Sequence, residues 1–418
     1  MSIHKTINFE YDKSFWDFEG IKKEGIHTLG KYPATMVAQM QSELLKIVID
    51  NSNTESLSVL DPFMGTATSL VESQNFGAEV TGIDINPYAT LLSEVKLFSY
   101  NYIDVNDAAT EVINLVNSDF EFCLHSFPNI KKWYRADIIN DLSKIKSVIE
   151  QQPNLQIRKF LWVCFSETAL KFSNSRTSTF KLHSMKPEDI VKIKNTVIPH
   201  FISTVNKNKK VLNYQNVNTA YIHQGDSLAE MSSLPSNKYS IVCTSPPYGD
   251  NQTTVTYGQF SILPLKWISI SDLGVTDSLL DTYSGIDSAS LGGKKREREN
   301  TINLTTLDEY IGKISKEKQQ KVINFFEDYY LICKELVRVI IDEGYIMMTV
   351  GNRRVDRILQ PLDDITTEIM LELGMTQVTE FHRNIPTKAM PWKVSKVKSK
   401  GSVKSMSQET VLIYKKEI

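Results

Sequence analysis

Short apolar runs form the framework of this chain, and each of them ends at a polar residue. Runs of this length that are rich in β-branched residues and separated by helical segments are typical of buried strands in a parallel sheet. The pattern therefore predicts an α/β fold with a mostly parallel sheet. The strands are expected at residues 58–60, 78–83, 218–224, 239–243, 344–350, 376–382 and 410–414.

Apolar residues recur with helical periodicity in much of the chain between these runs. Strand alternation is weak throughout residues 100–215, so we expect a mostly helical insertion there. The chain is accordingly divided into residues 1–99, which begin the α/β domain, the insertion at 100–215, and residues 216–418, which complete the domain. Residues 249–320 are expected to form a second irregular region. Helices are expected at residues 32–50, 137–151, 156–171, 307–339 and 361–374.

The run at 239–243 is followed by the sequence Thr-Ser-Pro-Pro-Tyr at residues 244–248. Pro246 and Pro247 have no N–H donor and a fixed φ, so the backbone there is rigid and its carbonyl groups are free. Those carbonyls, the hydroxyl of Ser245 and the ring of Tyr248 suit a flat polar group that donates hydrogen bonds, such as the exocyclic amino group of a nucleobase. The alternative is a proline turn that carries a tyrosine without chemical purpose.

Residues 58–70 have the pattern of a strand, a tight loop and the start of a helix, and Asp84 ends the next strand. A loop at a helix N-terminus, followed about 20 residues later by an acid, is typical of a nucleoside site in a βαβ unit. The loop has one glycine where a pyrophosphate cradle needs three, and Asp61 at its mouth would repel phosphate. The predicted ligand is therefore a nucleoside with a cationic amino-acid tail, namely S-adenosylmethionine.

At these two motifs the chain resembles the amino-group DNA methyltransferases of restriction-modification systems, which modify cytosine N4 or adenine N6. Residues 61–68 are similar to the cofactor loop D-P-F-x-G-x-G-T of that family, and residues 245–248 to its catalytic tetrapeptide [DNS]-P-P-[YFW]. Ala67 replaces a glycine of the family pattern, and we expect an ordinary negative φ there. The resemblance extends over nearly the whole chain, from residues 27–34 to residues 383–391.

The resemblance implies a Rossmann-like class I S-adenosylmethionine-dependent methyltransferase sheet, mostly parallel with its last strand antiparallel. It also implies methyl transfer to N4 of a flipped cytosine in double-stranded DNA, because the serine form of the tetrapeptide is associated with cytosine. The alternatives are an N6-adenine enzyme, an RNA guanine N2 or protein amide methyltransferase, and a silent S-adenosylmethionine-binding DNA-recognition subunit. The expected catalytic residues are Ser245, Pro246, Pro247 and Tyr248. The expected cofactor-binding residues are Tyr32, Pro33, Asp61, Pro62, Phe63, Gly65, Thr66, Asp84, Ile85, Asp226 and Ser227.

Charge is distributed unevenly, although the whole chain carries a formal net charge of −2. Between Lys131 and Lys210 there are sixteen Lys and Arg residues against six Asp and Glu residues. A basic stretch is often only a solvated face, but beside a base-modifying motif it favours a surface that follows DNA phosphates. The expected DNA contacts are Asn174, Arg176 and Lys181 in the insertion, Tyr257 after the tetrapeptide, and Lys388, Trp392 and Lys393 before the last strand.

The four cysteines are far apart and the seven histidines are scattered without metal-ligand spacing, so we expect neither a disulfide framework nor a metal. The N-terminus lacks a signal-peptide pattern and no run of 18 apolar residues occurs. We therefore expect a soluble cytoplasmic protein without membrane contact. A monomer that binds double-stranded DNA, paired functionally with a cognate restriction endonuclease, is the expected assembly.

Overall fold

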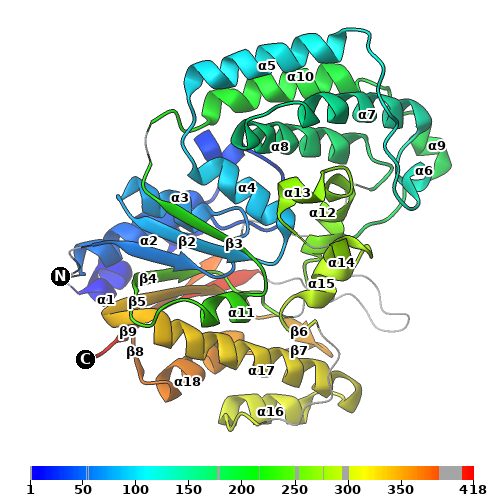
Figure 1. Ribbon diagram of the computed structural model, residues 1–418. Coiled ribbons are helices and arrows are strands. Elements are labelled where there is room, and N and C mark those ends of the chain that lie inside the picture. The colour runs from blue at the N-terminus through cyan, green and yellow to red at the C-terminus, as the bar shows by residue number, and fades with distance from the viewer. Residues whose placement is uncertain are drawn as a thin grey trace.

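A seven-stranded sheet forms the centre of the protein, in the order β3-β2-β1-β4-β5-β9-β8 (Figure 1). The computed structural model describes residues 2–52, 54, 56–176, 179–215, 217–249, 254–275, 277–293, 301–385 and 407–418. The strands of the sheet are β1 (Ser58–Asp61), β2 (Glu79–Asp84), β3 (Ala220–Gln224), β4 (Tyr239–Thr244), β5 (Ile340–Val350), β8 (Met375–Asn384) and β9 (Gln408–Lys416). A separate hairpin consists of β6 (Arg354–Val355) and β7 (Ile358–Leu359).

The direction of the strands agrees with the expected fold class. β1 to β5 pair in parallel, and β9 lies antiparallel between β5 and β8. The order of the parallel strands reverses between β1 and β4, and in open α/β sheets ligands bind at the carboxyl ends of strands beside such a reversal. The Rossmann-like methyltransferase sheet, mostly parallel with its last strand antiparallel, is thus confirmed.

Helices cover both faces of this sheet, which explains why all six residues of β4 are buried. Successive residues of a strand point to opposite faces. Val59 accordingly packs among the helices of one face and Leu60 among those of the other. The first face carries α1 (Ile3–Lys5), α2 (Ala38–Asp50) and α3 (Thr68–Asn75), and the second carries α11 (Ser227–Ser232), α17 (Lys316–Val339) and α18 (Leu362–Glu372), with α16 (Thr305–Lys313) outside them (Figure 1).

A layer of helices stands above the sheet in Figure 1. In the chain, these helices come after α4 (Pro87–Leu97) and before β3. The central helix of this layer, α8 (Leu155–Phe172), buries twelve of its 18 residues, as expected of a helix surrounded by others. We call this layer the helical lobe. Its other helices are α5 (Tyr102–Asn117), α6 (Ile130–Trp133), α7 (Ala136–Glu150), α9 (Pro187–Ile190) and α10 (Val197–Asn208).

The residues that follow the tetrapeptide separate into two groups. The first group packs into the core of the helical lobe, where Leu263 and Trp267 are buried beside α8. In the second group, α17 packs on the sheet, and α16 packs on α17 and α18. The first group contains α12 (Tyr257–Leu265), α13 (Ile270–Leu273), α14 (Asp277–Leu280) and α15 (Gly285–Ala289).

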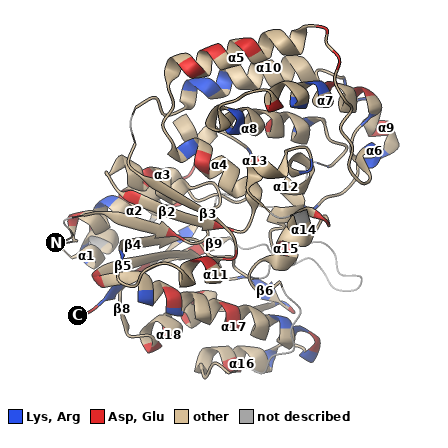
Figure 2. Ribbon diagram, viewed as in Figure 1, with Lys and Arg blue, Asp and Glu red and all other residues tan. Residues whose placement is uncertain are grey.

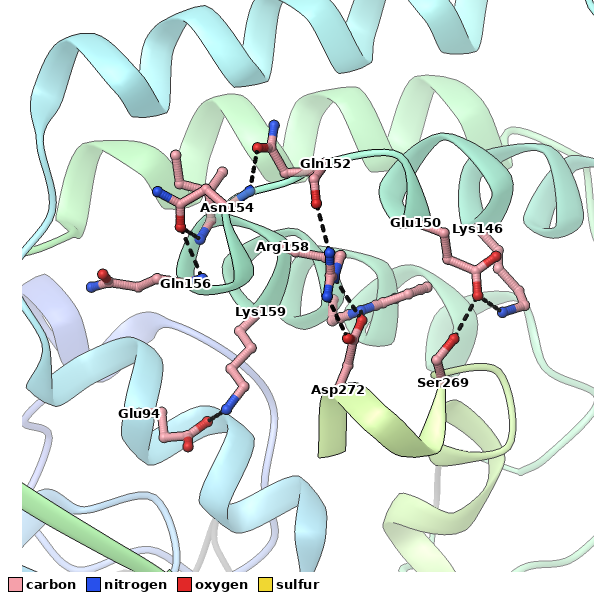
Figure 3. Close-up of polar contacts among 12 residues, drawn as sticks. Glu94, Lys146, Glu150, Gln152, Asn154, Gln156, Arg158, Lys159, Ser269 and Asp272 are labelled. Atoms are coloured by element: carbon pink, nitrogen blue, oxygen red, sulfur yellow. Dashed lines mark hydrogen bonds and ion pairs between the residues drawn. The ribbon is translucent and has the colours of Figure 1, made fainter. Parts of the chain in front are cut away.

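Polar contacts fasten α8 to its neighbours on two sides (Figure 3). Arg158 donates from Nε and Nη2 to the two carboxylate oxygens of Asp272 on α13, at 2.8 and 2.7 Å. Trp162 donates its Nε1 proton to the same carboxylate at 2.8 Å. On the other side, Lys159 pairs with Glu94 of α4 at 2.5 Å. Helix α8 therefore connects α13 to α4, which packs beside the sheet.

Two helix boundaries differ from the expectation. The helix expected from residue 32 begins at Ala38, because the preceding residues take extended and turn conformations, including a left-handed Ala34. The helix expected at 307–339 is two helices, α16 and α17, separated at Ser315, whose extended backbone starts the second one. In the described part of the chain, no helix has the combined length and apolar character that crossing a bilayer requires.

Candidate active site

A cavity of about 1070 Å³ opens at the carboxyl ends of the parallel strands. Ligand sites of single small molecules have volumes of roughly 300–1,000 Å³, so this cavity has room for a nucleoside cofactor and a second planar group. Both motifs singled out in the sequence border it. The expected site residues that line it are Tyr32, Phe63, Gly65, Thr66, Asp84, Ile85, Asp226, Ser227, Ser245, Pro246, Pro247, Tyr248 and Tyr257.

The loop between β1 and α3 is held in a left-handed conformation at two positions. Gly65 has φ of 52°, which glycine adopts without cost. Ala67 has φ of 58° and ψ of 33°, so the expected ordinary φ at this position is wrong. Ala67 is the N-cap of α3, and its left-handed backbone turns the chain into that helix.

Asp61 does not face the cavity, contrary to its expected place at the loop mouth. Its side chain is fully buried and accepts hydrogen bonds from the N–H of Phe63 at 3.0 Å, from Thr244 at 2.6 Å and from Ser69. Burial raises the pKa of Asp61 to about 6, against the lowering effect of these three donors. Asp61 thus holds the loop from its buried side, away from the cavity. Pro33 and Pro62 also lie outside the lining of the cavity; the carbonyl of Pro62 accepts a hydrogen bond from Ser227 at 2.6 Å.

Asp84 ends β2 and lines the cavity, as the sequence predicts for an acid that binds ribose hydroxyls. Its Oδ2 accepts the N–H of Gly65 at 2.9 Å, and its Oδ1 accepts the N–H of Asn86 at 2.8 Å. A carboxylate has about four acceptor positions, so these two bonds leave acceptor capacity on Asp84 for a ligand. Burial raises the pKa of Asp84 to about 7. The protonation state of this carboxyl therefore changes close to neutral pH.

A lysine supports the same loop from α4. Lys96 is 2% exposed and donates from Nζ to the carbonyl of Thr66 at 3.3 Å. Burial is the main cause that lowers the pKa of Lys96 to about 7, and the nearby positive charge of Lys23 contributes. Lys96 was not among the expected site residues, because a lysine in a helix is normally expected at the surface.

Two aromatic rings form the wall next to Asp84. Tyr32 stacks on Tyr257, with ring centroids 5.4 Å apart and an angle of 23° between the planes. Asn86 donates to the hydroxyl of Tyr32 at 3.2 Å and to Ser261 of α12 at 3.0 Å. Tyr257 was expected to contact DNA. The structure places it in the cavity wall, next to the expected cofactor residues.

The next strand contributes Asp226, the N-cap of α11. Its Oδ1 accepts the N–H groups of Leu228 and Ala229 at 3.1 and 3.2 Å, which fixes the carboxylate at the rim of the cavity. Asp226 stands one strand away from Asp84 in the sheet, since β2 and β3 are neighbours. The two acids thus border the same part of the cavity.

The tetrapeptide leaves β4 at its carboxyl end and places two hydroxyls together. The Ser245 Oγ lies 3.2 Å from the Tyr248 hydroxyl, which donates to Oε1 of Glu409 at 3.0 Å. Oε2 of Glu409 lies 3.6 Å from Nη1 of Arg383. Burial and the charge of Glu409 raise the pKa of Tyr248, so its hydroxyl keeps its proton at neutral pH.

Glu409 and Arg383 line the cavity but were not among the expected site residues. They are cross-strand partners, Glu409 near the start of β9 and Arg383 near the end of β8. Each lies one residue beyond an expected strand, at 376–382 and at 410–414, so the sequence signal that could have indicated them is an arginine and an acid at the adjoining ends of the last two expected strands.

The expected DNA contacts have different environments. Asn174 is 3% exposed and donates to the carbonyl of Lys132 at 3.0 Å, so its side chain holds the helical lobe together and offers no surface to DNA. Arg176 and Lys181 are exposed, and Arg176 donates to the carbonyl of Ser184 at 3.2 Å. Lys388, Trp392 and Lys393 lie outside the described residues.

Basic and acidic residues are interspersed along the helices of the helical lobe (Figure 2). Acidic residues predominate on α5, whereas Lys and Arg are frequent on α7, α8 and α10. Among the described residues, no group of three or more His, Cys, Asp or Glu side chains has the arrangement of a metal site.

Sequence comparison relates almost the entire chain to a known enzyme. It is 29% identical over 424 aligned residues to Type II methyltransferase M.MvaI of Kocuria varians, covering 95% of this chain and 92% of that protein. The chain is similar to a Type II methyltransferase. A shorter match, 31% identical over 124 residues, links 28% of this chain to 22% of Type II methyltransferase M.MjaII of Methanocaldococcus jannaschii. The expected resemblance to methyltransferases is therefore supported over the whole length.

Comparisons with family models and with solved structures give no match or only weak matches. No family model matches the chain. A solved S-adenosylmethionine-dependent methyltransferase from Methanosarcina mazei is 10% identical with a TM-score of 0.32, over 89% of this chain and 97% of that one. The fold assignment depends on the strand order and direction described above.

Proposed function

We propose that this protein is an S-adenosylmethionine-dependent DNA methyltransferase that modifies N4 of a flipped cytosine in double-stranded DNA. The observation that supports this proposal most is that one cavity is lined by the loop after β1, by Asp84 and by the Ser245–Tyr248 tetrapeptide. Similarity to a Type II methyltransferase over 95% of the chain supports the same reaction class.

The residues of the cavity fit the chemistry of the cofactor. Asp84 has free acceptor positions for the two ribose hydroxyls, and the Asp226 carboxylate can accept from the adenine amino group. Phe63 and Ile85 provide apolar surfaces for the purine. The stacked rings of Tyr32 and Tyr257 suit a neighbouring sulfonium cation, which aromatic faces attract.

Bound S-adenosylmethionine supplies a methyl group on a positively charged sulfur. The target amine is a weak nucleophile because its lone pair is delocalised into the base, and a base within a duplex must be flipped to reach the cavity. Tyr248 stacks on the flipped base, while the Pro246 carbonyl and the Ser245 oxygen accept hydrogen bonds from the amino group. These bonds localise the lone pair on nitrogen. With S-adenosylmethionine bound, the nitrogen would take the methyl group as the carbon–sulfur electron pair went to sulfur, and the nitrogen would then release a proton to water.

Catalysis in this proposal comes from positioning and from a preorganised polar site. Ser245 favours cytosine over adenine, since the serine form of the tetrapeptide is associated with N4 methylation. An N6-adenine DNA methyltransferase is the second candidate, because every other feature of the site would be the same.

The helical lobe and the region after the tetrapeptide are the candidate DNA-reading surfaces. Arg176 and Lys181 are exposed on the lobe and can follow phosphates. For Lys388, Trp392 and Lys393 we propose that the tryptophan stacks on the strand and the lysines clamp it. A monomer that acts beside a cognate restriction endonuclease completes the proposal.

The test is to incubate the purified protein with unmethylated genomic DNA and S-adenosylmethionine, digest the DNA to nucleosides, and analyse them by mass spectrometry. We expect N4-methyldeoxycytidine, and much less of it with Tyr248→Ala. N6-methyldeoxyadenosine would keep the reaction class and reject the role of Ser245 in choosing the base. If S-adenosylmethionine binds but no DNA nucleoside is methylated, the proposal is wrong, and RNA, a protein amide and a silent subunit remain to be tested.

A further inference from the structure

We propose that Glu409 is a positioning residue that fixes the direction of the hydrogen bonds in the active site and so makes Ser245 an acceptor for the target amine. This inference rests on the proposed function and adds a residue from the last strand to it. It starts from the chain of contacts Arg383–Glu409–Tyr248–Ser245, which reaches from the sheet edge to the tetrapeptide.

Hydroxyl groups can donate or accept, so two adjacent hydroxyls have no intrinsic direction. Ser245 and Tyr248 are such a pair, 3.2 Å apart, and either oxygen could be the donor. Without a third group, Ser245 could donate its proton to the target nitrogen. That bond would occupy the lone pair that must attack the methyl group, and the reaction would slow.

The carboxylate of Glu409 removes this ambiguity. An ionised carboxylate only accepts hydrogen bonds, so Tyr248 must donate its single proton to Oε1 of Glu409, 3.0 Å away. Tyr248 can then only accept from Ser245. The Ser245 proton is used in that bond, and its remaining lone pair is available to the amino group of the base.

Two further observations support this direction. Arg383, which is 4% exposed, lies 3.6 Å from the other carboxylate oxygen and pairs with it from the side away from Tyr248. Burial raises the pKa of Tyr248, so the hydroxyl retains the proton that it donates. Both groups line the cavity, at the carboxyl edge of the sheet where the tetrapeptide lies.

A purely structural role is the competing explanation, in which Glu409 serves only to neutralise the buried Arg383. The two explanations differ in how Glu409 and Tyr248 depend on each other. If Glu409 acts through the Tyr248 hydroxyl, its replacement has no effect once that hydroxyl is absent. If Glu409 acts only on Arg383, the effects of the two replacements multiply.

The experiment measures single-turnover methyl transfer and S-adenosylmethionine affinity for Glu409→Gln, Tyr248→Phe and the double variant. Glutamine has the shape of glutamate but can also donate, so the direction is lost. We expect each single variant to transfer about tenfold more slowly, because one hydrogen bond changes direction or is lost, with unchanged cofactor affinity. The double variant should be no slower than either single variant.

Glu380→Gln, on the neighbouring β8, is the matched control, because Glu380 is exposed and bonded to Gln377 away from the tetrapeptide. It should leave the rate unchanged. Melting temperatures of all variants separate loss of folding from loss of rate. If Glu409→Gln does not fold, Tyr248→Phe still tests the inference, since it leaves the Arg383–Glu409 pair in place.

Three results would overturn the inference: full rate in Glu409→Gln, full rate in Tyr248→Phe, or losses that multiply in the double variant. Each of these requires a wild-type protein that methylates DNA. A wild-type protein without that activity would instead reject the proposed function, so the two failures are distinguishable.

Discussion

Asp61 and Thr244 are joined by a hydrogen bond of 2.6 Å, although 183 residues separate them in the chain. Asp61 holds the cofactor loop through Phe63 and Ser69, and Thr244 is the last residue of β4 before the tetrapeptide. The bond therefore fixes the position of the two halves of the active site relative to each other, inside the sheet and away from solvent.

Replacement of Thr244 tests this connection. Thr244→Val keeps the shape of the side chain and removes the donor, so the buried Asp61 carboxylate loses one of its three hydrogen bonds. We expect the free energy of unfolding to fall by about 1–3 kcal/mol, the usual cost of an unsatisfied buried group. Thr244→Ser should be close to wild type. Chemical denaturation measures both, and equal stability of the valine variant would contradict the anchoring role.

Cofactor affinity should depend on pH through Asp84. Its carboxyl has a pKa of about 7 without ligand, and ribose hydroxyls donate more strongly to the ionised form than to the protonated one. S-adenosylmethionine binding should therefore weaken as pH falls from 8 to 6, by up to about tenfold per pH unit below the pKa. Calorimetric titrations at each pH measure the affinity.

Asp84→Asn is the control for this pH dependence, because the cofactor's own amino group titrates equally in both proteins. The variant should bind more weakly at pH 8 and lose the part of the pH dependence that belongs to Asp84. Asp84→Ala should weaken binding further. Identical pH profiles for wild type and Asp84→Asn would place the ribose hydroxyls elsewhere.

The ring of Tyr248 should matter more than its hydroxyl. Stacking of a base on an aromatic side chain is worth roughly 1–3 kcal/mol. We expect Tyr248→Ala to lose most activity, while Tyr248→Phe retains much more because it keeps the ring. Methyl transfer to DNA measures both. Equal losses would mean that stacking is not the role of this residue.

The left-handed conformation of Ala67 predicts an asymmetric response to substitution. Ala67→Gly relieves a backbone cost of about 1–2 kcal/mol, while it loses a buried methyl worth about 0.8 kcal/mol. The melting temperature should change little. Ala67→Val should destabilise strongly, because a β-branched residue at positive φ is a genuine outlier. Thermal denaturation tests the pair, and a well-tolerated valine would contradict the assigned conformation.

The Asp272 carboxylate should be essential for the attachment of α13 to the helical lobe. Asp272→Ala leaves the Arg158 guanidinium and the Trp162 N–H without their partner, which we expect to cost about 3 kcal/mol in a largely buried setting. Chemical denaturation measures the loss, with the exposed Glu121→Ala as control. S-adenosylmethionine affinity should stay unchanged, since none of these three residues lines the cavity. A stable alanine variant would mean that the apolar core alone holds α13.

Local sequence patterns predicted the parallel part of the sheet and the residues at its carboxyl ends. The apolar runs gave the positions of β1, β2 and β4, and the residues that follow these strands, such as Asp84 and Ser245, line the cavity. Such positions are predictable because the end of each strand can be recognised from neighbouring residues alone.

Features that depend on tertiary packing could not be obtained in this way. Whether the carboxylate of Asp61 faces ligand or core depends on where Ser69 and Thr244 lie. The conformation of Ala67 is imposed by the turn that the sheet and α3 require. Glu409 joins the site only because β9 inserts between β5 and β8, which brings it beside Tyr248 from 161 residues away.

β9 runs against its neighbours, so the end of β8 and the start of β9 meet at the same edge of the sheet. The connection between them leaves from this edge and returns to it, next to the cavity. Its length and composition can change during evolution without altering the register of the two strands, because loop length has a small effect on stability. Exchange of that connection would therefore leave Arg383 and Glu409, which lie at its two ends, in their places beside the tetrapeptide.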